Sequence, residues 1–496
     1  MRPTALPFTK VLIANRGEIA CRVEDTLKEM GITSVAVFHD SERKARFVQL
    51  ADEAHEIVGE TPVAAYLDGG QIIEIALSSG AEAIHPGYGF LSENADFARQ
   101  VSEAGLVFIG PEPASIELMG DKITSRKFAE EHGVPVAQSV LTDGDLDGFV
   151  KKASAIGFPL LIKASAGGGG KGMSIVHSAD ELAESARVAA SEAERYFADS
   201  TIYAERYVEK PRHIEVQVVG DGNGNVVHLF ERECSIQRRF QKIIEEAPSA
   251  GLADELRDRI CEAAVRLASA ANYRNAGTVE FILAPDGAFY FLEMNTRLQV
   301  EHPVSEMITG IDLVRMQIEI AAGLPLGVSQ DDIGVSGHAI ECRICAEVPE
   351  RDFMPATGKV LELDPPAASH IRFENGLVEG HYVTLSFDSM LAKLVVHGEN
   401  RKAAIDCTVE ALRETVLLGV ETNLDYLSRV ADHPVFRDGA LHTGFVTEHE
   451  QDLVAPPPDE MERDAALLAA ALAFREFRTL VFDAPDPYAS MGGWRN

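Results

Sequence analysis

This sequence has few cysteines, one tryptophan and no long apolar run. Six cysteines are spread along 496 residues, and the one close pair, Cys342 and Cys345, has no second pair with which to hold zinc. No stretch approaches the ~18 apolar residues that a membrane-spanning helix needs. The first residues lack a basic stretch followed by an apolar one, so we expect no secretory signal. These absences predict reduced, structural cysteines and a cytoplasmic protein, or one of the mitochondrial matrix in a eukaryote.

Basic residues are also scarce. The chain has 45 lysines and arginines against 78 aspartates and glutamates, which gives a formal charge of −33. Such a charge argues against binding along a nucleic-acid backbone and against anchoring to an anionic membrane. The length suits about three domains of ~150 residues each. The basic residues that are present are clustered, so an anionic substrate is still compatible with the sequence.

Short apolar runs alternate with helical patterns at the start of the chain. Residues 10–14 and 35–38 are predicted strands on either side of a helix. Residues 72–77 are a further predicted helix, followed by a third strand at 83–84. Strand, helix and strand at this spacing predict a doubly wound parallel sheet to about residue 120.

The pattern changes twice further along the chain. Hairpins mixed with helices are predicted from 121 to about 335, and short strands followed by helices from 336 to about 448. A proline-rich break at 454–458 precedes a predicted helix over 461–474. The tail, 483–496, is polar and rich in turn-forming residues, which is typical of a linker.

Four consecutive glycines, Gly167 to Gly170, lie between predicted strands at 160–163 and 173–176. Backbone N–H groups of such a loop can surround an anion, and the neighbouring lysines add positive charge. The run is not a Walker A loop, because neither that motif's first glycine nor its Ser/Thr is present. A formal G-x-G-x-x-G match is weak because a strand, not a helix, follows it. We therefore predict a mobile loop that covers phosphates.

The sequence around Asp286-Gly287 predicts a hairpin with a two-residue turn. If that turn sets the register, Glu280 lies directly opposite Glu293, with Asn295 on the same face. Two opposed carboxylates repel by roughly a few tenths to one kcal/mol even when exposed. No lysine or arginine lies on either strand, so a divalent cation such as Mg²⁺ is the predicted partner. The opposite face is predicted to pack in the core through Val279, Phe281, Leu283, Tyr290, Leu292 and Met294.

Two clusters of donors occur in this acidic chain. The first holds Arg232, Arg238, Arg239 and Lys242, and the second holds Arg297, Gln299, Glu301 and His302. An anion with several oxygens needs donors that converge in this way. The alternative is salt bridging to nearby glutamates. The two interpretations are balanced for Arg232, whereas anion binding is favoured for Lys242 and Arg297.

Nine short motifs follow one another along the chain: 14–20 (ANRGEIA), 85–94 (HPGYGFLSEN), 119–122 (MGDK), 162–173 (IKASAGGGGKGM), 211–217 (PRHIEVQ), 234–248 (CSIQRRFQKIIEEAP), 293–303 (EMNTRLQVEHP), 338–343 (HAIECR) and 387–394 (FDSMLAKL). Through them, residues 8–448 resemble the biotin carboxylase component of biotin-dependent carboxylases, of the acyl-CoA carboxylase α-subunit type, within the ATP-grasp superfamily.

The resemblance implies an α/β and α+β fold with three domains and a tail. These are a Rossmann-like N-terminal domain (1–120), an ATP-grasp domain (121–335) with a mobile lid at about 137–207, a biotin carboxylase C-terminal domain (336–450), and a linker with a helix (451–496) that leads toward a carrier or transferase part.

The resemblance also implies ligand contacts. ATP would contact Lys122, Lys163, Gly167, Gly168, Gly169, Gly170, the backbone of Glu205 to Val208, His213 and Gln237. Two Mg²⁺ ions, or Mn²⁺ in their place, would bind Glu280, Glu293 and Asn295. Bicarbonate would be held by Lys242, Arg297, Gln299 and the Val300 backbone, and the biotin ring would face Tyr88 and Arg343. Glu301 would act as the base, and Arg343 would stabilise the biotin enolate.

The implied reaction explains these residue types. Bicarbonate is a poor electrophile, so ATP first converts it to carboxyphosphate, a step that requires positioning and charge neutralisation. No Met-Lys-Met biotinylation sequence occurs, so biotin is expected on a separate carrier or on a missing C-terminal part. No carboxyltransferase domain is apparent either. The expected partners are therefore a biotin carrier, a carboxyltransferase subunit and a second copy of the chain.

The sequence departs from the family pattern at two positions and is compatible with two alternative functions. Phe240 stands where many members have a histidine, and Ser174 replaces a common arginine; both affect nucleotide affinity at most. Another ATP-grasp ligase, joining a carboxylate to an amine, would share the glycine loop and metal hairpin but leaves Tyr88 and Arg343 unexplained. A non-catalytic scaffold would predict loss of the lysines or of the paired glutamates, and all of these are present.

Overall fold

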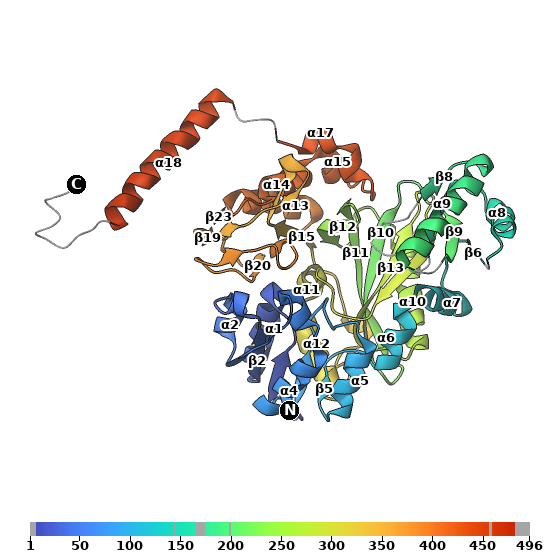
Figure 1. Ribbon diagram of the computed structural model, residues 1–496, viewed down its shortest axis with the longest axis horizontal. Coiled ribbons are helices and arrows are strands. Elements are labelled where there is room, and N and C mark those ends of the chain that lie inside the picture. The colour runs from blue at the N-terminus through green and yellow to red at the C-terminus, as the bar shows by residue number, and fades with distance from the viewer. Residues whose placement is uncertain (1–5, 143, 165–173, 198–199, 456–458, 482–496) are drawn as a thin grey trace, which may run out of the picture. The chain divides into compact units, whose positions relative to one another are not determined.

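The computed structural model describes residues 6–142, 144–164, 174–197, 200–455 and 459–481 (Figure 1). The chain forms two compact units, residues 1–453 and 454–496. The four glycines of the predicted phosphate loop lie outside the described residues, as does the predicted tail. Within the described ranges, no helix combines the length and apolar character needed to cross a membrane.

A parallel sheet begins the first unit. Its strands are β1 (Lys10–Ile13), β2 (Thr33–Phe38), β3 (Glu53–Glu56), β4 (Ala83–His85) and β5 (Val107–Phe108), in the order β3-β2-β1-β4-β5. The helices of this region are α1 (Gly17–Met30), α2 (Arg46–Leu50), α3 (Pro62–Tyr66), α4 (Gly69–Ser79) and α5 (Ala95–Glu103). The predicted doubly wound sheet is confirmed. As in such sheets generally, the loops after β1 and β4 lie together at the carboxyl edge, and Asn15 Nδ2 donates to the Tyr88 carbonyl oxygen across them at 2.7 Å.

A small antiparallel sheet follows α6 (Pro113–Gly120) and α7 (Lys122–Glu131). Its strands are β6 (Ser139–Leu141), β9 (Ile202–Arg206), β7 (Leu160–Ala164) and β8 (Ser174–Val176), in that spatial order. Helices α8 (Leu146–Ser154) and α9 (Ala179–Phe197) pack on it and close a core of their own. Strands β7 and β8 are the two that were predicted on either side of the glycine-rich loop.

The central element is an eight-stranded antiparallel sheet with the order β14-β13-β10-β11-β12-β15-β22-β20. In chain order these are β10 (Arg212–Asp221), β11 (Val226–Arg238), β12 (Gln241–Ala247), β13 (Arg274–Leu283), β14 (Phe289–Asn295), β15 (His338–Cys345), β20 (Ile371–Asn375) and β22 (Met390–Gly398). The pairing of β12 with β15 carries the sheet across the predicted domain boundary at 335/336.

The two faces of this sheet differ in polarity. On one face, apolar residues pack against α10 (Asp254–Ala270) and α13 (Arg401–Glu414). The other face carries His213, Glu215 and Gln217 on β10, and α11 (His302–Thr309) packs against it. Because side chains alternate along a strand, every second position of β10 supplies one polar face. This face and the loop before α11 carry most of the predicted site residues.

The predicted hairpin register is right at the carboxylates and wrong at the turn. Glu280 pairs with Glu293, but Leu283 pairs with Phe289, one residue out of the predicted register. The register shifts between these pairs, at Leu292, which is the extra residue of a β-bulge. The core-facing residues of β14 nearest the turn are therefore Phe289 and Phe291, and the prediction of Tyr290 and Leu292 is wrong.

The remaining elements complete the two units. The first unit also contains helices α12 (Leu313–Ala321), α14 (Leu424–Asp432), α15 (Pro434–Arg437), α16 (Phe445–Glu448) and α17 (Glu450–Leu453). Its remaining strands are β16 (Glu347–Val348), β17 (Met354–Pro355), β18 (Gly358–Lys359), β19 (Glu362–Asp364), β21 (Tyr382–Val383) and β23 (Val416–Leu418). In the second unit, α18 (Glu460–Val481) contains the helix predicted over 461–474 and continues beyond it.

Candidate active site

One lysine on the polar face of the large sheet is surrounded by carboxylates. Lys242 Nζ, from β12, lies 2.6 Å from Glu215 Oε2, 2.6 Å from Glu301 Oε1 and 3.2 Å from Glu280 Oε1. Burial disfavours the charge, but these carboxylates raise the pKa of Lys242 well above its usual value. The Lys242 side chain is 12% exposed, so the ammonium can still be reached from outside.

Glu301 joins this lysine to Arg343. Its second oxygen, Oε2, accepts a hydrogen bond from the Arg343 guanidinium at 2.8 Å, and Arg343 Nε donates to Glu245 Oε1 at 2.6 Å. The Glu301 side chain is fully buried. Burial would raise its pKa, but the charges of Lys242 and Arg343 hold the pKa of Glu301 well below its usual range. The group is therefore an ionised carboxylate shared by two cations.

The carboxylate pair of the hairpin is asymmetric. Glu280 Oε1 accepts from Asn295 Nδ2 at 2.7 Å and from Gln299 Nε2 at 3.1 Å, and His213 Nε2 lies 2.9 Å from Glu280 Oε2. Burial opposes ionisation, but Lys242 and His213 lower the pKa of Glu280. The sequence argument that no cation balances this pair is thus wrong for Glu280, because both groups reach it from other strands.

Glu293 is the unbalanced member of the pair. Among the described residues, no side chain donates a hydrogen bond to its carboxylate. Burial and then the Glu280 charge raise the pKa of Glu293. A half-buried carboxylate that faces another carboxylate and lacks a donor suits a hard divalent cation, which prefers oxygen ligands. The donor set therefore fits Mg²⁺.

Arg297 connects the hairpin to the loop before α11. Its guanidinium donates to Asn295 Oδ1 at 3.1 Å, to Gln299 Oε1 at 3.0 Å and to Glu93 Oε2 at 2.9 Å. The side chain is 19% exposed. Arg297, Gln299 and Glu301, predicted from their spacing alone to converge, do lie around the Glu280 and Lys242 side chains.

The residues predicted to contact a nucleotide fall in two groups. On the small sheet, Lys163 Nζ lies 2.5 Å from Glu205 Oε1, and Val208 follows the end of β9. On the large sheet, Gln237 Nε2 donates to His213 Nδ1 at 2.9 Å. Lys122, the first residue of α7, is exposed. Sequence reasoning assigned His213 and Glu280 to different ligands, and the structure brings these two side chains into contact.

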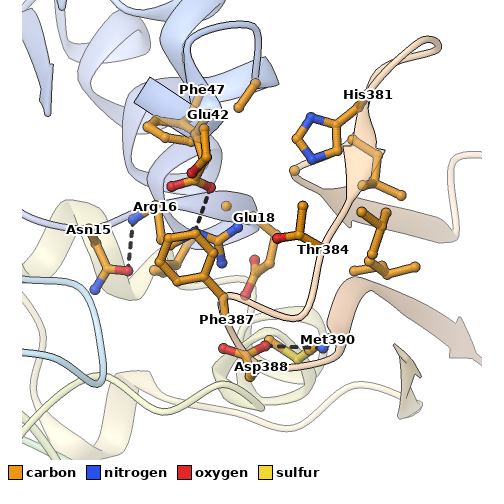
Figure 2. A pocket seen from close by; sticks show the side chains of 18 of the residues that line it. Asn15, Arg16, Glu18, Glu42, Phe47, His381, Thr384, Phe387, Asp388 and Met390 are labelled. Carbon is orange, nitrogen blue, oxygen red and sulfur yellow. Dashed lines mark hydrogen bonds and ion pairs between the residues drawn. The ribbon is translucent and has the colours of Figure 1, made fainter. Parts of the chain in front are cut away.

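Tyr88 is one of the residues that line a cavity of about 240 Å³ between the N-terminal region and the 376–391 segment. Figure 2 shows side chains that line this cavity. Its hydroxyl donates to Glu18 Oε1. Across the cavity mouth, the Arg16 guanidinium lies 3.9 Å from the Phe387 ring centroid and donates to Glu42 Oε1 at 2.6 Å. Three of the motifs quoted from the sequence, 14–20, 85–94 and 387–394, meet at this cavity, but of its lining residues only Tyr88 was given a role from the sequence.

Several buried charges near the site were missed or left undecided. Arg232 is fully buried, with its Nε 2.5 Å from Glu215 Oε1, so the salt-bridge interpretation holds for this residue. Glu215 was given no role, although polar residues at every second position of 213–217 indicate its face. Lys393 and Glu18 were also given no role, because their contact joins β22 to α1 and no local sequence pattern indicates it.

The two departures from the family pattern lie at exposed or partly exposed positions. Phe240 is 68% exposed at the tip of the β11–β12 hairpin, where Arg239 and Phe240 both have positive φ. Two consecutive positive φ values are typical of the type I′ turns that close two-residue hairpins. Ser174, the first residue of β8, is half-buried. Neither Phe240 nor Ser174 is among the residues that hydrogen-bond to Lys242.

Comparison with known families divides the chain into three matching segments. Residues 7–116 match the biotin carboxylase N-terminal domain, residues 121–329 the ATP-binding domain of the carbamoyl-phosphate synthase L chain, and residues 341–448 the biotin carboxylase C-terminal domain. Together the three segments cover nearly all of the first compact unit.

Individual relatives agree with this division. The mitochondrial methylcrotonoyl-CoA carboxylase subunit alpha of Dictyostelium discoideum is 45% identical over 493 residues, which are 99% of this chain and 70% of that protein. The biotin carboxylase of Nostoc sp. is 46% identical over 445 residues, 89% of this chain and 99% of that one. The biotin carboxylase domain dimer of Hydrogenobacter thermophilus 2-oxoglutarate carboxylase, solved with MgADP, ADP and bicarbonate, is 45% identical with a TM-score of 0.86 and covers 92% of this chain and 100% of that one. On the strength of these matches and of the fold, the chain belongs to the biotin carboxylase family.

Proposed function

We propose that this chain uses ATP and bicarbonate to carboxylate biotin carried on a partner protein. The observation that carries the proposal is Glu301, a buried carboxylate held between Lys242 and Arg343 beside the Glu280 and Glu293 pair. Phosphoryl transfer to a small anion requires cations, an ionised base and a carboxylate pair that can bind a metal, all within one site. The similar Hydrogenobacter domain binds MgADP and bicarbonate.

Bicarbonate would bind against Lys242, Arg297, Gln299 and the Val300 N–H. Lys242 is 12% and Arg297 19% exposed, so each can turn part of its donor capacity toward an incoming anion. The anion would compete with Glu301 for Lys242. Because Lys242 is one of the cations that hold the pKa of Glu301 low, sharing it raises that pKa. Anion binding would therefore turn Glu301 into a better base at the moment when it is needed.

Glu301 would then take the hydroxyl proton of bicarbonate. The freed oxygen attacks the γ-phosphorus of ATP, and ADP leaves with the electrons of the broken bond. The product, carboxyphosphate, splits into CO₂ and phosphate, and the phosphate takes the N1 proton of biotin. Arg343 would stabilise the negative charge that develops on the ureido oxygen, since its guanidinium already faces the Glu301 side of the site.

The proposed nucleotide contacts are Lys122, Lys163, His213 and Gln237, with the backbone from Glu205 to Val208. The loop holding Gly167 to Gly170 would add backbone donors. Mg²⁺ held by Glu280, Glu293 and Asn295 would neutralise phosphate charge. Glu280 already has Lys242, His213, Asn295 and Gln299 as partners, so Glu293 is the carboxylate with most capacity left for a cation.

Biotin would reach Arg343 from the side of Tyr88. Tyr88 lines the cavity of Figure 2 and donates to Glu18, which lies 3.3 Å from Lys393, the β22 residue that pairs with Arg343. The proposed partners are a biotin carrier protein or domain, a carboxyltransferase subunit and a second copy of this chain. The acceptor of the carboxyl group would be set by the transferase. We propose the cytosol, or the mitochondrial matrix in a eukaryote, as the compartment.

The first test is ADP release from Mg-ATP by the purified full chain, with and without bicarbonate and with and without free biotin. ADP release that requires bicarbonate and rises with biotin supports the proposal. Release that instead requires an amine and a carboxylate substrate would indicate a different ATP-grasp ligase. Absence of release under every condition, including added biotinylated carrier, would contradict catalysis by this chain.

A further inference from the structure

Lys393 is a buried lysine that the reaction proposed above does not use. It lies on β22, its side chain has no exposed surface, and its Nζ donates to the Val300 carbonyl oxygen at 2.8 Å. The same ammonium lies 2.9 Å from Glu374 Oε2 and 3.3 Å from Glu18 Oε1. An ammonium taken fully out of water needs such partners, and here a main-chain carbonyl of the proposed bicarbonate segment is one of them.

The contact between Lys393 and the Val300 carbonyl acts on the segment 299–302, which His302 also holds. His302 Nδ1 lies 2.7 Å from the Gln299 carbonyl oxygen, which accepts the hydrogen bond. In a planar trans peptide the N–H points opposite to the C=O, so this bond directs the Val300 N–H away from His302. Lys393 holds the next carbonyl, that of Val300. The peptide planes before and after the Val300 Cα are thus both held, one by His302 and the other by Lys393, and the second of them ends at the Glu301 Cα.

We infer that Lys393 is a positioning residue for bicarbonate: by holding the Val300 carbonyl it fixes the Val300–Glu301 peptide, and so keeps the Val300 backbone and the Glu301 carboxylate in place beside the anion. The inference rests on the proposed function, because it assigns Val300 and Glu301 the roles given there. Lys393 touches no substrate in this arrangement.

The same lysine also links the anion segment to the biotin side of the site. Glu18, one of its partners, accepts the Tyr88 hydroxyl and lines the cavity of Figure 2. Val300 and Tyr88 are therefore connected through Lys393 and Glu18. Loss of Lys393 would loosen the bicarbonate segment first, and Tyr88 only through Glu18.

The test compares Lys393→Met with wild type by steady-state ADP release, with bicarbonate varied at saturating Mg-ATP and biotin. We expect the bicarbonate KM to rise at least tenfold, while the KM for ATP changes less than twofold. KM does not depend on how many molecules are folded, so a purely structural defect would lower kcat and leave the bicarbonate KM unchanged. Arg372→Met is the matched control: it removes another cation from Glu374 without touching Val300, and its bicarbonate KM is expected to stay within twofold of wild type.

Lys393→Met leaves Glu374 buried with one cation fewer, so the Lys393→Met/Glu374→Gln double variant restores the charge balance. Its bicarbonate KM is also expected to rise at least tenfold, relative to Glu374→Gln alone. A KM within twofold in either Lys393 variant overturns the inference. So does failure of the double variant to fold when Glu374→Gln folds, because Lys393 would then be structural. If wild type itself shows no bicarbonate-dependent ADP release, the proposed function fails instead.

Discussion

Two clusters of buried charge lie on either side of the segment from Gln299 to His302, and they differ in access. The Lys242 cluster consists of Lys242, Glu215, Glu280, Glu301 and Arg343. The Lys393 cluster consists of Lys393, Glu18, Glu374, Arg22 and Arg372. In the first, Lys242 is 12% and Arg343 16% exposed. In the second, the central Lys393 has no exposed surface, and Arg372 at the edge of the cluster is 30% exposed.

This difference separates two uses of the same chemistry. In the Lys242 cluster a protein carboxylate can give way to a substrate anion, because part of each cation can be reached. Lys393 itself cannot be reached, and exchange of one of its partners for a ligand would require this buried charge to lose that partner, which costs several kcal/mol. The Lys242 cluster, called the open cluster below, is therefore suited to chemistry. The Lys393 cluster, called the closed cluster because its lysine is enclosed, is suited to holding the backbone that the chemistry needs.

The largest expected effect tests this division with one substitution made in both clusters. Glu301→Gln should lower bicarbonate-dependent ADP release about 10³-fold, since it removes a general base. Glu374→Gln, a carboxylate with similar cation partners in the closed cluster, should lower it less than tenfold. The measurement is kcat for both variants at saturating substrates. Equal losses would remove the functional distinction between the clusters.

Replacing Arg343, the second cation of the Lys242 cluster, is expected to have a smaller effect than replacing Glu301. Arg343→Met should lower carboxybiotin formation about 10²-fold, as loss of one donor to a developing oxyanion does. Bicarbonate-dependent ADP release without biotin should fall much less, because Arg343 is assigned to the biotin step. Carboxybiotin and ADP are measured in the same reactions. A parallel fall of both products would show that Arg343 serves the first step instead.

The carboxylate pair provides a third test, with an effect of about tenfold. Glu293→Gln should raise the Mg²⁺ concentration for half-maximal ADP release by about tenfold, because an amide oxygen is a weaker ligand than a carboxylate. Glu233→Gln changes a buried carboxylate of β11 that pairs with Arg212, away from the hairpin pair, and serves as the control. A Glu293→Gln enzyme with the wild-type Mg²⁺ requirement would contradict metal binding at the hairpin.

The smallest effect concerns stability and pH. Burial opposes ionisation of Glu374, but Lys393 and Arg372 hold its pKa well below the usual 4.5. A depressed carboxylate pKa stabilises the fold above pH 4.5, and that stabilisation is lost as the pH falls below 4.5 toward the folded-state pKa. Glu374→Gln should therefore have a lower free energy of unfolding than wild type at pH 7. The difference in free energy of unfolding between the two proteins should become smaller below pH 4.5. Urea midpoints at pH 7 and pH 4 measure it; a gap that widens in acid would contradict the ion pairing.

The sequence predicted the open cluster far better than the closed one. Lys242 and Glu301 stood out because each lies in a short stretch of charged and polar residues, and side chains grouped within one segment tend to converge in space. Lys393 and Glu18 stand alone in apolar or mixed runs. Their pairing depends on how β22 and α1 meet, and residues so far apart in the chain give no local pattern.

The hairpin shows both what spacing can predict and where it fails. The turn residues predicted two strands and placed Glu280 against Glu293, which the structure confirms. The prediction succeeded at that pair through two errors of opposite sign. The turn is one residue longer than expected, and the bulge at Leu292 restores the register before Glu293. A bulge has no reliable sequence signal, so the identity of the core-facing residues could not be predicted.

That hairpin also provides a natural position for a reporter. Asp286 is exposed at its tip, three residues beyond the end of β13 and six from Glu280, which is at most about 20 Å at the rise of an extended strand. All six native cysteines are buried or half-buried, so a cysteine placed at position 286 would be the most accessible thiol among the described residues. A fluorophore attached there would lie outside the reaction centre yet on the hairpin leading to it. Energy transfer from such a dye to a labelled nucleotide would follow substrate arrival directly, in real time and without waiting for turnover.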